Sequence, residues 1–199
     1  DLHSFPTRRS SDLAILYTGA TNTTEGTVPT ASRTGYTFAG WYTDATNGSQ
    51  VYNASGVLQK NVSGYTSNTT TPTWIATENK NLYAHWTTVT YSITSTYNGG
   101  SCTSANPTTY NVETPTITLC TPTKTGYTFG GWYTSSNFSG SAVTQIAKGS
   151  TGDKTFFAKW NACSYTNASA AAGTSSTCVG TCATGYGNLS CNASGCTCT

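Results

Sequence analysis

The chain carries the segment Arg33-Thr-Gly-Tyr-Thr-Phe-Ala-Gly-Trp-Tyr-Thr43 and, later, the nearly identical Lys124-Thr-Gly-Tyr-Thr-Phe-Gly-Gly-Trp-Tyr-Thr134. Each copy is followed by a second matching segment, first Asn81-Leu-Tyr-Ala-His-Trp86 and then Thr155-Phe-Phe-Ala-Lys-Trp160. The two segments come in the same order both times, which indicates an internal repeat. We therefore expect each pair of segments to form one structural unit.

The second copy is complete and runs over residues 87–160. Near its start Tyr91 and Ile93 alternate with Thr and Ser, a period of two that predicts a strand with one buried face. Asn98-Gly99-Gly100 then supplies the positive φ angles of a turn. No long stretch has a helical period, and at most a short helix follows Trp132. Further extended segments are expected at Tyr110 and Val112, at Ile117 and Leu119, and at Phe156, Ala158 and Trp160.

A unit of this size buries a low fraction of its surface, so a few large side chains must supply its core. Each aromatic side chain buries roughly 150–250 Å². We predict one mainly aromatic core for each copy. In the first copy these residues are Tyr36, Phe38, Trp41, Leu82 and Trp86. In the second copy they are Tyr91, Ile93, Tyr127, Phe129, Trp132, Phe156 and Trp160.

Together these motifs resemble the internalin B B-repeat family, also called the Listeria–Bacteroides repeat. The resemblance covers residues 14–160 in two copies, and the first copy lacks its beginning. It implies small β-grasp, ubiquitin-like domains in tandem arrays on secreted or surface-attached bacterial proteins. It also implies roles in adhesion, in host or matrix contact, or in spacing other modules, and it brings no catalytic, cofactor or metal-binding residues.

The predicted fold class is mainly β, at most α+β, with tandem repeats and a disulfide-rich irregular tail. We expect a first repeat at 14–86 with an insertion rich in Asn, Ser and Thr, a second repeat at 87–160, and an incomplete cysteine-rich segment at 161–199. Residues 1–13 match a sequencing adapter when back-translated. We interpret them as an artefactual leader of an environmental DNA fragment and exclude them from the fold.

Composition excludes several classes of protein. Charged residues make up 8 % of the chain and the net charge is +2, so there is no basic patch for nucleic acid. Aromatic residues make up 12 %, more than a disordered polar chain carries. No apolar run reaches about 18 residues, so this fragment contains no predicted membrane span.

The chain has 8 cysteines. Cys102 and Cys120 lie in the second copy and are a candidate disulfide, with two buried free thiols as the other interpretation. The remaining six crowd a tail with few core-forming side chains, where disulfides are expected but their connectivity is left open. Zinc is the alternative there, although no histidine lies near the Cys178 and Cys182 pair. The six are Cys163, Cys178, Cys182, Cys191, Cys196 and Cys198.

Groups for catalysis are sparse. Outside the leader the histidine is His85 and the acids are scattered, whereas acid–base catalysis needs paired carboxylates or an oriented histidine. His85 stands at the position of Lys159 in the other copy, which favours a solvated strand residue. We therefore expect a protein that is not an enzyme and that has no cofactor.

Aromatic residues in or near the insertion raise one binding hypothesis. Tyr52, Tyr65 and Trp74, together with Tyr42, are candidates for a flat surface on which a sugar stacks; the other interpretation is that Trp74 packs onto its own domain. The leading prediction is an extracellular, non-catalytic adhesive or spacer module. Its expected partners are a host or matrix protein or glycan and neighbouring repeats of the chain. The alternative is a carbohydrate-binding module appended to a lost enzyme domain.

Overall fold

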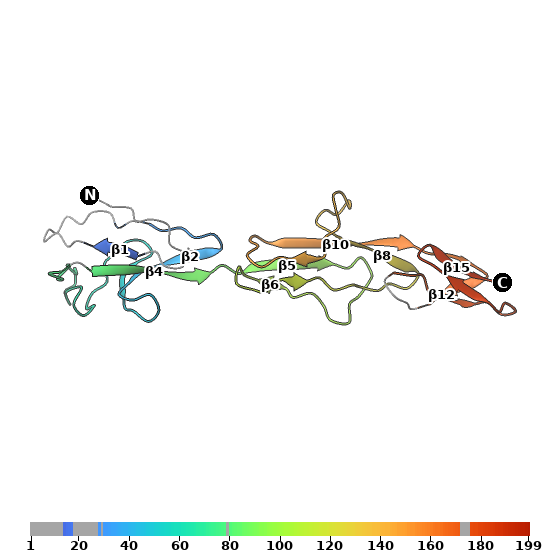
Figure 1. The fold of residues 1–199 in the computed structure, drawn as a ribbon, viewed down its shortest axis with the longest axis horizontal. Coiled ribbons are helices and arrows are strands. Elements are labelled where there is room, and N and C mark those ends of the chain that lie inside the picture. The colour runs from blue at the N-terminus through green and yellow to red at the C-terminus, as the bar shows by residue number, and fades with distance from the viewer. Residues whose placement is uncertain (1–13, 18–27, 29, 79, 172–175) are drawn as a thin grey trace. The chain divides into compact units, whose positions relative to one another are not determined.

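The computed structural model describes residues 14–17, 28, 30–78, 80–171 and 176–199, and every regular element in these ranges is a strand (Figure 1). The mainly β fold class is thereby confirmed. Residues 1–13, interpreted as a leader, lie outside the described residues. Within the described residues, no helix has the length and apolar character needed to cross a bilayer.

Contacts within the chain separate two compact units, Asp1–Val89 and Thr90–Thr199. Unit 1 contains the first repeat, and unit 2 contains the second repeat together with the cysteine-rich end. The finer division into leader, repeats and separate tail stays a prediction.

Unit 1 is a four-stranded sheet with the order β1-β4-β2-β3. Its strands are β1 (Ala14–Tyr17), β2 (Tyr36–Tyr42), β3 (Gln50–Asn53) and β4 (Lys80–Thr88). All three neighbouring pairs are antiparallel. The repeated motif forms β2, and its second segment forms the central strand β4, so the two matching segments pair side by side within one unit.

Unit 2 has a four-stranded sheet with the order β6-β5-β10-β8. Its strands are β5 (Tyr91–Thr96), β6 (Thr109–Tyr110), β8 (Tyr127–Tyr133) and β10 (Lys154–Ala162). The first strand, β5, and the last, β10, are parallel at the centre, and the outer strands are antiparallel to them. This is the strand arrangement of a β-grasp sheet. A smaller antiparallel pair, β7 (Ile117–Thr118) and β9 (Gln145–Ile146), completes the repeat.

The same aromatic triad occupies the core of each unit. In unit 1 the Phe38 ring lies 5.5 Å from the Trp41 ring and 5.4 Å from the Trp86 ring, measured between centroids. The matching distances in unit 2 are 5.7 Å from Phe129 to Trp132 and 5.5 Å from Phe129 to Trp160. Trp41 and Trp132 are almost fully buried. Around the triads lie Leu82 in unit 1 and, in unit 2, Ile93, Phe156 and the partly buried Tyr91.

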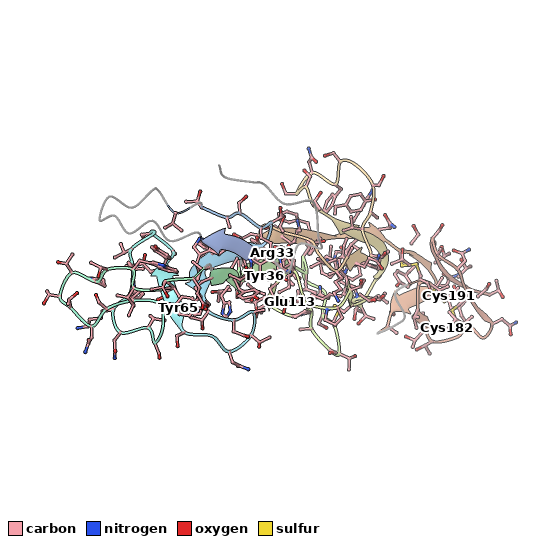
Figure 2. All side chains as sticks on the ribbon, turned by 60° about the vertical axis from the view of Figure 1, so that its left-hand side comes forward. Arg33, Tyr36, Tyr65, Glu113, Cys182 and Cys191 are labelled. Atoms are coloured by element: carbon pink, nitrogen blue, oxygen red, sulfur yellow. A yellow bond between two sulfur atoms is a disulfide. The ribbon has the colours of Figure 1, made fainter. Side chains whose placement is uncertain are left out.

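Two predicted core tyrosines lie outside these clusters. Tyr36 and Tyr127 each open their strand, half-buried, directly after a glycine with φ of 80°. Arg33 lies over the Tyr36 ring at 3.7 Å and Lys124 over the Tyr127 ring at 4.2 Å (Arg33 and Tyr36 are labelled in Figure 2). Each ring is covered by a cationic side chain that itself stays near solvent, and not by the apolar core, which explains the incomplete burial.

The segment after Trp132 forms turns and bends where at most a short helix was expected. Asn137 accepts hydrogen bonds from the Ser135 hydroxyl and the Ser139 backbone N–H. Such local bonds compete with helical hydrogen bonding. Phe138 follows with φ of 59° and its ring contacts Tyr133 edge-on, which completes the turn.

The cysteine-rich end contains short strands where an irregular tail was expected. They are β11 (Ser164–Thr166), β12 (Ala168–Ala170), β13 (Gly180–Cys182), β14 (Leu189–Cys191) and β15 (Gly195–Cys198). Three disulfides hold them together, Cys163–Cys178, Cys182–Cys198 and Cys191–Cys196 (Cys182 and Cys191 are labelled in Figure 2). The Cys163 backbone N–H donates to the Gly126 carbonyl at 2.9 Å. The tail is therefore hydrogen-bonded to the start of β8.

Candidate functional site

The predicted ligand surface loses Tyr52, which lies on β3 and is buried. Tyr52 is fully buried, in register with Trp41 of β2, and belongs to the core of unit 1. A register shift between Trp41 and Tyr42 breaks the alternation, so that Val51 and Tyr52 are both buried. Tyr52 therefore offers no face on which a sugar could stack.

The insertion folds back on its own unit. Tyr65 and Trp74 are half-buried and meet edge-to-face at 5.8 Å and 90°. The Ile75 backbone N–H donates to the Tyr65 carbonyl at 2.9 Å, which closes this part of the loop. Both rings pack against the core of unit 1. They form a corner against the core and not a flat platform, in line with the interpretation that Trp74 packs onto its own domain.

The exposed apolar side chains of the insertion are elsewhere. Val57 is 57 % exposed and Ile75 is 50 % exposed. Among the large apolar side chains of the insertion that the structure describes, these two are the exposed ones, whereas the Tyr65 and Trp74 rings are half-buried. Single exposed aliphatic side chains are common on soluble proteins and do not by themselves define a ligand site.

His85 lies on the face of β4 opposite the core. One face of its ring and one ring nitrogen each have a partner. The ring stacks on Tyr42, with centroids 3.8 Å apart and planes 7° from parallel, and Nε2 lies 2.8 Å from the Asp44 carbonyl oxygen. In unit 2 the ammonium of Lys159 lies 5.4 Å from the Tyr133 ring centroid. The same pair of positions therefore makes a ring contact in both copies, which indicates that His85 covers a tyrosine face.

The carboxylate of Asp44 is occupied by its own turn. It accepts hydrogen bonds from the Thr46 backbone N–H at 2.9 Å and the Thr46 hydroxyl at 3.0 Å. These bonds, with the Thr46 backbone first, lower the pKa of Asp44, and His85 contributes least. Asp44 thus stabilises a turn, while its backbone carbonyl contacts His85.

Cys102 and Cys120 form a disulfide in unit 2. The Cys120 carbonyl accepts a 2.7 Å hydrogen bond from Trp132 Nε1, and its backbone N–H donates to Asn106 Oδ1, also at 2.7 Å. Asn106 is buried and its amide also donates to the Ser95 hydroxyl of β5 at 3.1 Å. The disulfide is thereby connected to both the aromatic core and the central sheet.

Sequence reasoning missed Asn106. The only signal in the sequence is the Asn106-Pro107 pair, which predicts a turn but not a buried amide that bridges β5 and the Cys120 backbone. The metal alternative for the cysteines does not apply to the structure, because all eight are paired with one another. Among the described residues, no group of His, Cys, Asp and Glu is arranged to hold a metal ion.

Comparison with known protein families finds one match in each copy of the repeat. A family model described as the Listeria-Bacteroides repeat domain matches residues 12–65 and 88–159. The two matched segments confirm the resemblance and the two copies that the motifs indicated. Comparison with curated proteins and with solved structures gave no match.

Proposed function

Because the chain belongs to the Listeria-Bacteroides repeat family, which is typical of bacterial surface proteins, we propose that it is a non-catalytic extracellular module. It acts in adhesion or as a spacer stalk that carries other parts of a surface protein. Its partners on this view are a host or matrix protein or glycan, and neighbouring repeats.

The observation that carries this proposal is the duplicated core. Phe38, Trp41 and Trp86 in unit 1 have the same mutual geometry as their counterparts in unit 2, and each triad is completed within its own unit. A unit that buries its own core can be repeated without new contacts. This is the property of an independent domain, and it suits a spacer.

The disulfides support an extracellular location. Eight cysteines form four disulfides, and disulfides form and persist mainly outside the cytosol. Three of them lie in a tail that has few apolar side chains to form a core. Covalent cross-links suit a module that has to keep its shape outside the cell.

The polar groups support a non-catalytic role. Asp44 holds its own turn, and Asp153 accepts a hydrogen bond from the Ser92 backbone N–H at 2.7 Å. His85 contacts a tyrosine ring and a carbonyl oxygen. Each of these groups has a structural partner, and none faces another in an acid–base pair.

Single-molecule stretching of the full chain tests the proposal. We expect two separate unfolding events, one for each unit, because each has its own core. Removal of the Cys102–Cys120 bond by a double change to serine releases 18 residues and lengthens the unit 2 event by about 6 nm, at about 3.5 Å per residue. The unit 1 event should keep its length. A single event for the whole chain, or turnover of any substrate by the purified protein, would contradict the proposal.

Glycan binding provides the complementary measurement. A spacer binds no glycan on an array, and an adhesive module that binds one does so through residues other than the buried Tyr52. Binding that is lost in Trp74→Ala while unit 1 stays folded would instead support the carbohydrate-binding alternative.

A further inference from the structure

The two copies differ at one edge of the central strand. In unit 2 the residues Lys154, Thr155, Phe156 and Phe157 of β10 pair with β5, and the pairing is parallel. In unit 1 the matching residues Lys80, Asn81, Leu82 and Tyr83 of β4 pair with β1, and the pairing is antiparallel. The same four positions thus accept a neighbouring strand in both copies, but from opposite directions.

The direction of β1 matches that of a different strand of the complete copy. In unit 2, β6 is antiparallel to β5, and β5 is parallel to β10. β6 therefore runs opposite to β10, as β1 runs opposite to β4. By its direction β1 corresponds to β6, yet it lies in the position that β5 takes in unit 2.

A buried donor marks the same difference. Trp160 Nε1 donates to the Tyr97 carbonyl at 2.9 Å, directly after the end of β5. Its counterpart Trp86 has Nε1 buried and, among the residues that the structure describes, without a hydrogen-bond partner. The two indoles are held alike, since Trp86 lies 59° from the Phe38 plane and Trp160 lies 58° from the Phe129 plane. A buried donor without a partner lowers stability, because it has lost its hydrogen bond to water and gained none in the protein.

The turn after β5 also fits the tryptophan closely. Asn98 Nδ2 donates to the Ala158 carbonyl of β10 at 2.8 Å. A Cβ on Gly100 would lie 2.2 Å from the Trp160 ring, so only glycine allows the backbone to lie against the indole here. The Tyr-Asn-Gly-Gly segment therefore contacts β10 through the Tyr97 carbonyl, the Asn98 amide and the backbone at Gly100.

From these observations we propose that the β4 edge of unit 1 is an acceptor for an added strand. Its ligand is an extended peptide with the pattern of residues 91–100, Tyr-x-Ile-x-x-x-Tyr-Asn-Gly-Gly, which pairs parallel to β4. The carbonyl of the second tyrosine accepts the hydrogen bond of Trp86 Nε1, and β1 moves outward to the position that β6 takes in unit 2. Strand addition of this kind draws affinity from backbone hydrogen bonds and specificity from alternate side chains.

The sequence of the ligand follows from β5, the strand that occupies the matching position in unit 2. Ile93 is buried on β5, facing the core, whereas Ser92 and Thr94 on either side of it are exposed. The core-facing positions of the acceptor are nearly the same in both copies, with Leu82 and Ala84 in place of Phe156 and Ala158. An isoleucine at the same position of an added strand therefore meets a similar apolar surface.

The test uses the full chain and a synthetic peptide of residues 90–101, followed by NMR of the tryptophan indole protons. We expect the Trp86 indole proton to shift and to become protected from exchange, as we expect for that of Trp160, which donates to the Tyr97 carbonyl. Trp86→Phe, which keeps a ring but removes the donor, should weaken binding about five- to tenfold. Trp160→Phe is the matched control and should leave binding unchanged, because β5 already occupies the acceptor in unit 2. A peptide with Ile93→Asp should bind at least about tenfold more weakly.

A fused variant guards against an affinity too low to detect in solution. A second copy of residues 90–107 is placed directly before Ala14 in the full chain, in place of residues 1–13, which raises the effective concentration of the strand. Protection of the Trp86 indole proton in this variant supports the proposal. An unprotected Trp86 indole in the fusion, or peptide binding that depends on Trp160 and not on Trp86, overturns it.

Discussion

Unit 1 and the repeat of unit 2 build the same triad of rings but support it by different means. In unit 1 the core is extended by aliphatic side chains from β3 and the insertion, among them Val51, Leu58 and Val62. In unit 2 a disulfide and the buried Asn106 hold the segment before β8 against the core. The comparison teaches that the aromatic triad and the pairing of the two repeated strands define the fold, whereas the stabilisation around them is exchangeable.

The largest expected effect comes from removing a triad ring in one unit only. Trp41→Ala and Trp132→Ala should each destabilise their own unit by about 3–5 kcal/mol, because a large buried side chain is replaced by a cavity. Residue-resolved hydrogen exchange on the full chain measures the two units separately. Equal loss of protection in both units from either single change would show that the units are not independent.

A smaller effect is expected for the covalent clamp. Changing both Cys102 and Cys120 to serine should lower the free energy of unfolding of unit 2 by about 2–4 kcal/mol. Chemical denaturation that is monitored by residue-resolved hydrogen exchange measures this change in unit 2. Unit 1 contains no cysteine and is the internal control. Unchanged stability of unit 2 would mean that Asn106 and Trp132 alone hold the Cys120 segment.

The indole donors sharpen the comparison further. Trp160→Phe removes the hydrogen bond to the Tyr97 carbonyl, whereas Trp86→Phe removes a donor that has no partner among the described residues. Both changes remove similar volume, so their difference isolates the hydrogen bond. Trp160→Phe should cost about 1 kcal/mol more than Trp86→Phe. Urea denaturation of the two single variants gives this difference, and equal costs would count against it.

The smallest expected effect concerns acid. The hydrogen bond from the Ser92 backbone N–H lowers the pKa of Asp153 in the folded state. A lowered folded-state pKa gives stability that is present above the unfolded value, near pH 4, and is lost as the pH falls through the folded value. Asp153→Asn should therefore reduce the loss of unit 2 stability that occurs as the pH falls below about 4. An unchanged acid profile in thermal unfolding would contradict this role.

Asp44→Asn is the matched variant in unit 1. Its pKa is lowered by bonds within one turn, chiefly from the Thr46 backbone. The bond of Asp153, by contrast, joins Ser92 of β5 to the residue before β10, far apart in sequence. The acid sensitivity of unit 1 should consequently respond less to Asp44→Asn than that of unit 2 responds to Asp153→Asn.

Local patterns in the sequence were sufficient for β2 and β4 of the first repeat and for the strands of the second repeat other than β9. The alternation through Tyr91 and Ile93 corresponds to β5, and Asn98-Gly99 has the positive φ angles that its composition predicts. The repeated segments correspond to β2 and β8 and to the strands that pair with them. These features depend on short-range sterics and on burial of one face, which a period of two records directly.

Features that depend on three-dimensional neighbours were not predictable in the same way. Alternation is identical in parallel and antiparallel strands, so the opposite directions of β1 and β5 leave no trace in the sequence. Tyr52 was a candidate for an exposed surface because a register shift at Trp41 cannot be read from composition. Six cysteines allow 15 pairings, and only the fold decides which of their Cα atoms come within reach.

The placement of the cysteines has a consequence for how the protein matures. Unit 1 contains no thiol, so its folding requires no oxidant and proceeds at the rate of strand pairing. The tail of unit 2 takes its shape from three cross-links, and thiol oxidation requires seconds to hours. Unit 1 is therefore folded before the disulfides of the tail have formed. The supply of an oxidant then limits the time that the whole protein needs to mature.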